Sequence, residues 1–292
     1  MSDSGPPSLV FLKLGGSLLG DKRRRRAFRR AVVERLGGEI VRALEGHPQM
    51  RLLLAHGGGG FAHFPAERHR TREGLAGGGG WRGFAETRRG VLEMNARVLD
   101  ALALGGLHPV LVSPSAELIA RDGKVRCWDL RVIRALLKGG QVPLIHGDAV
   151  LDERRGFTIL STEELFDFLA GRLHPERIIL ACDVEGVYLA GLRRLSFAPP
   201  AVQERAADCA RCVDRKNIAG VRRALRAAVE PRAGRPDVTG GMLAKVERLY
   251  RIARRVPGLD ARIVSGLIAG TVESALCGGE VGTAVRGDGD EY

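Results

Sequence analysis

Four short stretches place a glycine turn directly after a run of apolar residues. They are "KLGGS" (13–17), "HGGGG" (56–60), "HGD" (146–148) and "DVEG" (183–186), and a glycine pair at 240–241 opens a later helix. In open α/β sheets, ligands bind at the carboxyl ends of the strands. Glycine at these ends lets backbone N–H groups approach a phosphate, and a helix N-terminus adds a favourable partial charge. The pattern therefore predicts a phosphate-binding cleft.

Three side chains near these turns could act on bound phosphates. Lys13 ends the first apolar run, Lys22 follows nine residues later, and His63 comes shortly after the four glycines. Phosphoryl transfer requires mainly the alignment of two polyanions and the neutralisation of charge in transit. The lysines could bridge the donor and acceptor phosphates, and His63 could hydrogen-bond an acceptor that already carries a phosphate. Structural interpretations stay open, because Lys22 also begins the solvated run "KRRRR" and a helix histidine near a glycine turn is often structural.

Spacing excludes two familiar nucleotide motifs. Gly57-x-Gly59-x-x-Ala62 fits the relaxed dinucleotide fingerprint, but the acidic residue expected about 20 residues later falls in the glycine-rich stretch 74–83. No strand is readable there. The stretch "GGSLLGDK" lacks the G-x-x-x-x-G-K-[ST] spacing of a P-loop.

Composition indicates a basic globular protein of 292 residues, with 45% hydrophobic residues and a net charge of +12. The chain has neither a long apolar run nor a secretion signal at its start, so we expect a cytoplasmic protein with no membrane partner. The positive charge suits an anionic partner or an arginine-rich solvated surface. No nucleic-acid-binding motif accompanies "DKRRRRAFRR" (21–30), so no nucleic-acid partner is predicted. "CARC" (Cys209, Cys212) lacks the second ligand pair of a zinc site, and no metal-ligating residues are predicted.

The elements that must hold these residues alternate between strands and helices. Strands are expected over 9–14, 51–56, 109–113, 142–147, 177–182 and 261–266, with a further short run at 282–287. Helices are expected within 27–45 and over 84–104, 129–138, 161–173, 216–229, 237–256 and from 271, with hairpins across 117–128 and 149–160. The glycine-rich stretch 74–83 is expected to be a loop, and Ser161 with Glu164 forms a capping box. Six or more strands with crossover helices predict a three-layer αβα sandwich with a mainly parallel central sheet.

Seven motifs follow one another along the chain: "KLGGSLLGDK", "HGGGGFAH", "VPLIHGDAV", "GFTILS", "DVEGVY", "DVTGGMLAKV" and "EVGT". Together they resemble the amino acid kinase superfamily, and their context is most similar to that of the isopentenyl phosphate kinases. The match extends over roughly 9–188 and 236–286.

The resemblance implies one two-lobed domain of the amino acid kinase fold over residues 8–287. Its lobe 8–176 would hold the phosphate acceptor, and its lobe 177–287, with an atypical segment at 190–236, would bind the nucleotide. The implied enzyme is a phosphotransferase that uses ATP with Mg²⁺ to convert isopentenyl phosphate to isopentenyl diphosphate, a step of an alternative mevalonate route to isoprenoids. A homodimer is also implied.

The resemblance also assigns roles to individual residues. Its catalytic residues would be Lys13, Lys22, His63 and Glu163, and the acceptor would contact Gly58, His63 and Gly147. ATP would contact Lys13, Gly15, Gly16, Ser17, Gly59, Asp183, Gly186, Gly241 and Lys245.

Two motifs depart from the pattern of the family. "STEE" (161–164) stands where the family usually has "SGDD", so Glu163 would replace the aspartate that orients the lysines, and "DVEG" replaces "DVDG". These departures leave two alternatives open. One is a kinase of the same fold that acts on another phosphate or on a phosphonate, like the fosfomycin-resistance kinases. The other is a non-catalytic relative that binds a ligand or nucleic acid.

Overall fold

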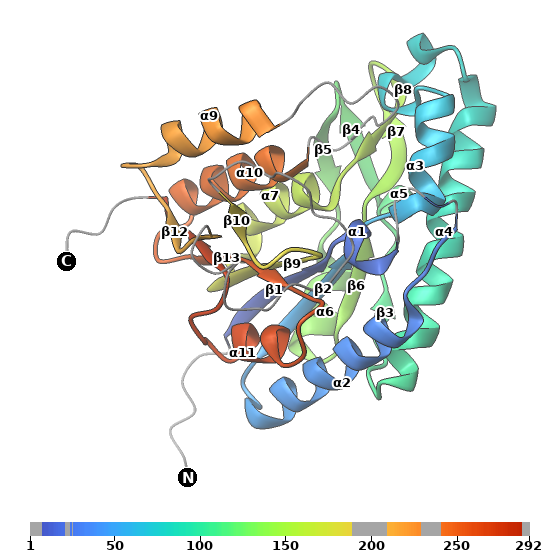
Figure 1. Ribbon diagram of the computed structural model, residues 1–292. Coiled ribbons are helices and arrows are strands. Elements are labelled where there is room, and N and C mark those ends of the chain that lie inside the picture. The colour runs from blue at the N-terminus through green and yellow to red at the C-terminus, as the bar shows by residue number, and fades with distance from the viewer. Residues whose placement is uncertain (1–7, 21–23, 25, 189–208, 229–240, 288–292) are drawn as a thin grey trace.

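The computed structural model describes residues 8–20, 24, 26–188, 209–228 and 241–287 (Figure 1). Lys22 lies outside the described residues, as do the first glycine of the pair at 240–241 and most of the segment 190–236. The predictions that concern them are therefore not examined by the structure. Within the described part of the chain, no helix has the length and apolar character needed to cross a membrane.

An eight-stranded sheet forms the centre of the molecule, with the strand order β12-β14-β13-β9-β1-β2-β6-β3. Neighbouring strands are parallel except for β13 and β14, which are antiparallel. The strands are β1 (Leu9–Leu14), β2 (Arg51–His56), β3 (Val110–Leu111), β6 (Pro143–His146), β9 (Arg177–Cys182), β12 (Cys212–Val213), β13 (Asp260–Ser265) and β14 (Thr283–Val285). The predicted sandwich with a mainly parallel sheet is confirmed.

Helices cover both faces of this sheet (Figure 1). One face packs against α6 (Arg131–Lys138), α7 (Thr162–Leu173) and α10 (Gly241–Arg255), with α9 (Ile218–Ala228) beside α10. The other face packs against α2 (Arg30–Gly46), α4 (Gly80–Leu104) and α11 (Thr271–Leu276), and α3 (Gly59–Arg68) packs on α4.

Smaller elements complete the fold. A four-stranded sheet contains both predicted hairpins, and a two-stranded sheet joins β10 to β11. These strands are β4 (Leu118–Arg121), β5 (Lys124–Trp128), β7 (Asp148–Asp152), β8 (Gly156–Leu160), β10 (Val187–Tyr188) and β11 (Cys209–Ala210). The short helices are α1 (Gly16–Leu19), α5 (Pro114–Glu117) and the 3₁₀ segment η1 (Thr71–Gly77).

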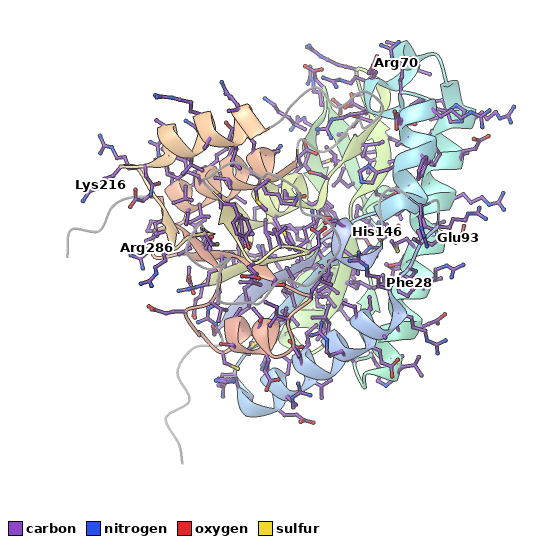
Figure 2. The ribbon with its side chains drawn as sticks, in the orientation of Figure 1. Phe28, Arg70, Glu93, His146, Lys216 and Arg286 are labelled. Atoms are coloured by element: carbon purple, nitrogen blue, oxygen red, sulfur yellow. The ribbon has the colours of Figure 1, made fainter. Side chains whose placement is uncertain are left out.

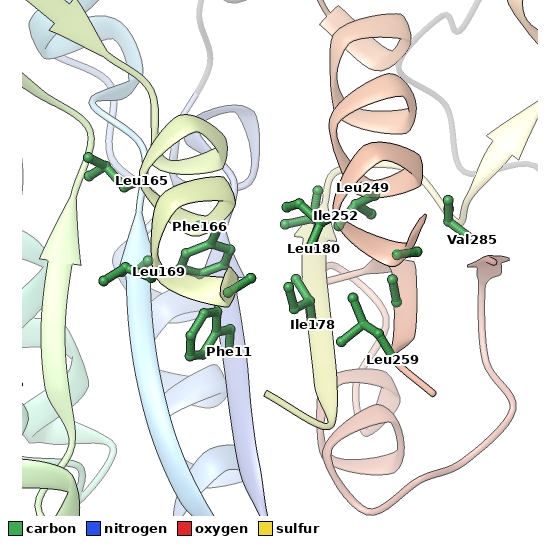
Figure 3. Close-up of a cluster of buried hydrophobic side chains, with 14 of the residues drawn as sticks. Phe11, Leu165, Phe166, Leu169, Ile178, Leu180, Leu249, Ile252, Leu259 and Val285 are labelled. Atoms are coloured by element: carbon green, nitrogen blue, oxygen red, sulfur yellow. The ribbon is translucent and has the colours of Figure 1, made fainter. Parts of the chain in front are cut away.

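Side-chain alternation along β1 divides the apolar interior into two cores. Val10, Leu12 and Leu14 pack into the core beneath α2, α4 and α11, whereas Phe11 packs into the core beneath α6, α7 and α10. Successive residues of a strand point to opposite faces of the sheet. Lys13 is in phase with Phe11 and therefore faces α7 and α10. Figure 3 shows the second core, in which Phe11 lies against the side chains of α7.

The loop predicted over 74–83 is wrong. The segment instead contains the end of η1 and the beginning of α4 at Gly80. Two glycines where the helices meet have positive φ, with values of 82° at Gly78 and 54° at Gly80. The Leu75 N–H also donates to the Arg155 carbonyl at 2.9 Å, which ties η1 to the hairpin of β7 and β8. The glycine content correctly indicated turns, but it gave no indication of the helical residues of η1 and α4 on either side of them.

Replacing Phe166 should reveal how strongly α7 depends on this core. The Phe166 ring is buried, and its centroid lies 5.1 Å from that of Phe11. Phe166→Ala should lower the free energy of unfolding by about 3–5 kcal/mol, because it leaves a cavity between β1 and α7. Urea denaturation measures this change. Val132→Ala, at an exposed position on α6, should change the free energy by less than about 0.5 kcal/mol. Equal, small effects of both substitutions would contradict the packing described above.

Candidate active site

A hollow opens at the carboxyl ends of β1, β2 and β6, where the first three glycine turns lie. Its empty volume is about 730 Å³, including space open to solvent. Eight of the residues predicted from sequence line it together: Lys13, Gly16, Ser17, Gly58, His63, Gly147, Glu163 and Lys245. They come from β1, α1, α3, α7, α10 and two turns, so the fold joins segments that are far apart in the chain.

Lys13 and Glu163 form a buried ion pair at the edge of this hollow. Each side chain is only 8% exposed, and Glu163 reaches Lys13 from the first turn of α7. Burial lowers the pKa of Lys13, and the Glu163 carboxylate opposes that effect. Burial alone would raise the pKa of Glu163, but Lys13 and Lys245 together hold it at about 2. Two lysines thus share one carboxylate, which leaves positive charge to attract a phosphate.

The first two glycine turns touch backbone to backbone. A Cβ atom on Gly16 would lie 3.0 Å from the Gly59 nitrogen, and one on Gly57 would lie 3.0 Å from the Gly16 nitrogen. Gly59 also has a φ of 52°, a value that favours glycine. The turns can approach this closely only because they lack side chains, and their approach narrows the polar end of the hollow.

The remaining predicted residues that the structure describes do not line the hollow. The Ser17 hydroxyl donates to the Asp183 carboxylate at 2.7 Å, so Asp183 contacts a residue that lines the hollow. The Gly241 carbonyl accepts a hydrogen bond from Lys245 at 3.3 Å, and the Gly15 N–H donates to Ala181 at 2.8 Å. Gly186, just before β10, packs tightly against Cys209 of β11 and Thr283 of β14.

Comparison with known proteins gives a consistent result. A model of the amino acid kinase family matches residues 8–265. The chain belongs to the amino acid kinase family. Isopentenyl phosphate kinase of Methanothermobacter thermautotrophicus is 33% identical over 287 residues, covering 96% of this chain and 99% of the relative. The enzyme of the same name from Methanocaldococcus jannaschii is 28% identical over 290 residues, covering 95% and 98%.

A solved structure supports the same family. An X-ray structure of isopentenyl phosphate kinase is 30% identical in sequence and has a TM-score of 0.74. The match covers 95% of this chain and 100% of the chain in that structure. The resemblance predicted from the seven motifs is therefore confirmed, together with the amino acid kinase fold.

Several residues that line the hollow were not predicted from the sequence. Apolar side chains of α3, α4, β7 and β8 form one wall: Ala62, Ala66, Val91, Ala149, Ile159 and Leu160. Arg72 of η1 and the buried Asp148 also line the hollow. The sequence could have indicated Asp148, because it is a carboxylate in the predicted glycine turn "HGD" after a strand. Arg72 had no such signal, because nothing in the sequence distinguishes it among the 46 lysines and arginines of the chain.

Two buried histidines lie behind the glycine turns. His56 ends β2 and His146 ends β6, and their ring centroids are 5.4 Å apart. The His56 Nε2 atom is 3.1 Å from the Asn95 Oδ1 atom, whereas the His146 Nε2 atom has no hydrogen-bond partner in the described part of the chain. Burial lowers the pKa of each histidine to about 4. Burial also raises the pKa of Asp148 to about 6, although Arg88 opposes this shift from 3.0 Å.

These shifts predict a loss of stability in mild acid. The folded-state pKa of each histidine lies below its ordinary value of 6.5, so the unfolded chain takes up more protons and stability falls as the pH drops from 6.5 towards 4. Asp148 acts in the opposite direction between about pH 6 and 4, and offsets one of the two histidines. Between about pH 6 and 4, His146→Gln should therefore reduce the pH dependence of the free energy of unfolding by about 1.4 kcal/mol per pH unit.

Urea denaturation at a series of pH values measures the slope. His108→Gln, at an exposed position, serves as the control and should leave the slope unchanged. If His146→Gln retained the full slope of the native chain, the buried histidine would not be the source of the acid sensitivity.

Proposed function

We propose that this chain transfers the γ-phosphoryl group of ATP to isopentenyl phosphate and releases isopentenyl diphosphate. The observation that carries the proposal is a single hollow that combines the buried Lys13–Glu163 ion pair and the half-buried Lys245 with an apolar wall. The cationic end suits phosphate groups, and the apolar wall suits a short hydrocarbon tail. The isopentenyl phosphate kinases among its relatives, which match over nearly the whole chain, support the same activity.

The chemistry demands little from a general base. The attacking group is an oxygen of the acceptor phosphate, which is already ionised at neutral pH. Lys13 and Lys245 would neutralise the charge that moves between the two phosphates, and Lys22 would add to that effect. Glu163 would hold Lys13 in position, and His63 would hydrogen-bond the acceptor phosphate. Backbone N–H groups of Gly16, Gly58 and Gly59 would cradle the phosphates.

Further parts of the proposal follow from the family resemblance. We place the acceptor in the lobe 8–176 and the nucleotide in the lobe 177–287, where Asp183, Gly186 and Gly241 would shape its pocket and Gly147 would face the acceptor. The protein would act as a homodimer in the cytoplasm, within an alternative mevalonate route.

Mg²⁺ would accompany ATP. The described residues include no group of three or more His, Cys, Asp or Glu side chains placed to hold a metal ion. Mg²⁺ in nucleotide sites is commonly held by substrate phosphates and few carboxylates. The phosphates of ATP would accordingly supply most of its ligands, and the ion would neutralise part of their charge.

Acceptor specificity tests this function directly. We expect ADP formation in a coupled assay with isopentenyl phosphate, and much less with fosfomycin, acetylglutamate or acceptors without a phosphate. Turnover with only a non-phosphorylated acceptor would refute the assignment. Preference for fosfomycin would favour the phosphonate kinase alternative, and an absence of turnover with every acceptor would favour a non-catalytic relative.

His63→Ala should impair acceptor use selectively. Loss of a hydrogen bond to a charged phosphate costs about 1.5–3 kcal/mol, so the KM for the acceptor should rise at least about tenfold. The KM for ATP should stay nearly constant. His108→Ala, at an exposed position, is the matched control. An unchanged acceptor KM in His63→Ala would assign His63 a purely structural role.

Glu163 substitutions test the buried ion pair. Glu163→Gln removes the carboxylate that opposes the lowered pKa of Lys13, so the kcat should fall by about 10²-fold and the alkaline limb of the pH–rate profile should shift to lower pH. Glu163→Asp retains the charge and should keep the alkaline limb near its native position.

Steady-state kinetics across pH provide the measurement. Glu153→Gln, on the exposed turn between β7 and β8, is the control and should behave like the native chain. A native kcat in Glu163→Gln would remove the ion pair from the mechanism.

A further inference from the structure

A second hollow lies on the side of α7 and α10 that faces the four-stranded sheet. We call it the arginine groove. Three of its residues, Arg248, Arg251 and Arg255, follow one another along α10 at helical spacing, and β5 contributes Lys124. Its empty volume is about 1070 Å³, including space open to solvent. Figure 1 shows α10 and α7 side by side, with the strands of the four-stranded sheet next to them.

The groove carries more positive than negative charge. Its lining contains six arginines and one lysine, but only three carboxylates. Asp167 of α7 illustrates the imbalance, because three arginines share its carboxylate. Arg248 and Arg251 lie 3.8 Å and 3.9 Å from it, and Arg255 bonds both the carboxylate and the Asp167 carbonyl, the latter at 2.7 Å. Each guanidinium has five N–H donors, so most of its donors remain available to another anion.

Two residues connect this groove to the active-site hollow. Arg72 lines both hollows, and its guanidinium lies 2.6 Å from the Glu164 carboxylate. Arg248 contacts the same carboxylate at 3.3 Å. Glu164 also accepts a hydrogen bond from the Ser161 N–H at 2.7 Å and so caps α7, the helix from which Glu163 reaches Lys13. An anion that draws Arg72 or Arg248 away from Glu164 would act next to the catalytic ion pair.

The competing interpretation is that these arginines only fasten α7 to α10 and keep a basic surface solvated. That interpretation explains the pairs with Asp167 and Glu164. It also explains Arg155, from the turn between β7 and β8, which pairs with the Asp122 carboxylate at 2.7 Å. It does not explain Lys124 of β5, whose side chain lines the groove and makes no hydrogen bond or ion pair with any described residue. Cations that converge from several elements on one concave surface are typical of a ligand site.

We propose that the arginine groove binds a small molecule bearing two or three linked phosphate groups. Arginine suits this ligand, because its planar fork bonds phosphate oxygens in pairs and is more weakly hydrated than an ammonium group. Linked phosphates match a set of guanidinium groups placed along one helix. A single hollow with carboxylates in its lining favours a compact anion over a continuous nucleic-acid strand. The site is separate from the proposed kinase activity and does not depend on it.

Calorimetric titration of the full chain with inorganic tripolyphosphate tests the proposal. The substitutions that follow lie outside the lining of the active-site hollow, so the difference in tripolyphosphate binding between variants reports on the groove. The double substitution Arg251→Ser/Arg255→Ser should weaken tripolyphosphate binding by at least about tenfold, since each charged contact contributes about one decade. Arg254→Ser, on the same helix but outside the groove, removes one of the two charges that the double substitution removes and should have little effect.

Asp167→Asn separates a ligand site from a structural network. It frees three arginines from a competing carboxylate, so tripolyphosphate should bind more tightly, by about threefold or more. A purely structural network would instead lose thermal stability and show no gain in binding. Equal affinity of the native chain and the double variant would overturn the proposal, as would weaker or unchanged binding in Asp167→Asn.

The source of the phosphates is resolved by competing ligands. A nucleoside triphosphate and an isoprenyl diphosphate are each titrated against bound tripolyphosphate, and the tighter competitor identifies the ligand class. Either result supports the site. Tighter binding of a short single-stranded RNA than of every small anion would refute a small-molecule groove and favour a nucleic-acid surface.

Discussion

A buried lysine must be paired or lose its charge, and that constraint organises the active site. Lys13 stands at the end of a central strand, almost out of reach of water, and Glu163 is its partner across the layer boundary. The pair can form only because β1 is flanked on one face by the start of α7, while α10 brings Lys245 close enough to act on both charges. One carboxylate between two lysines satisfies Lys13 without cancelling the positive charge. A bound phosphate would complete the balance, so the resting site is suited to an anion before any ligand arrives.

The first turn of α7 resolves two interpretations that seemed to compete in the sequence. Ser161 and Glu164 form the capping box, and Glu163 forms the ion pair with Lys13. Adjacent residues at the start of a helix point in different directions, so Glu163 can face the sheet while Glu164 turns back to the Ser161 N–H and outwards to Arg72 and Arg248. The cap therefore fixes the direction from which Glu163 approaches. Both carboxylates also lie where the helix dipole favours negative charge.

Sequence reasoning recovered the parts of the fold that local chemistry controls. Apolar runs that alternate with helical patterns were sufficient to predict the sheet, and the hairpin at Asp122-Gly123 and the cap at Ser161 formed as expected. The failures have two physical causes. Arg72 and Val91 enter the active site from η1 and α4 through tertiary packing, which leaves no local pattern. Glycines at 74–80 gave the turns but not the helices between them, since glycine lowers helix propensity without forbidding a helix. The sequence showed the excess of arginine as a net charge, but only the structure shows that several arginines gather on α10 and the elements beside it. Other basic side chains, such as Arg70, Lys216 and Arg286, project from the periphery of the molecule (Figure 2).

Glutamate at position 163 is consistent with this geometry. The capping box fixes the backbone of α7, so the distance from residue 163 to Lys13 is set by how the helix packs on β1 through Phe11 and Phe166. An aspartate on the same backbone would hold its carboxylate farther from the lysine, whereas the additional methylene of glutamate extends the carboxylate to Lys13. The longer side chain has one more rotatable bond to immobilise, at a cost of less than about 1 kcal/mol. Burial of both partners limits the conformations that the bond can adopt, and the ion pair with Lys13 offsets what remains. The aromatic core beneath α7 therefore sets the position of the helix, and the longer side chain of Glu163 pairs with the buried Lys13 from that position.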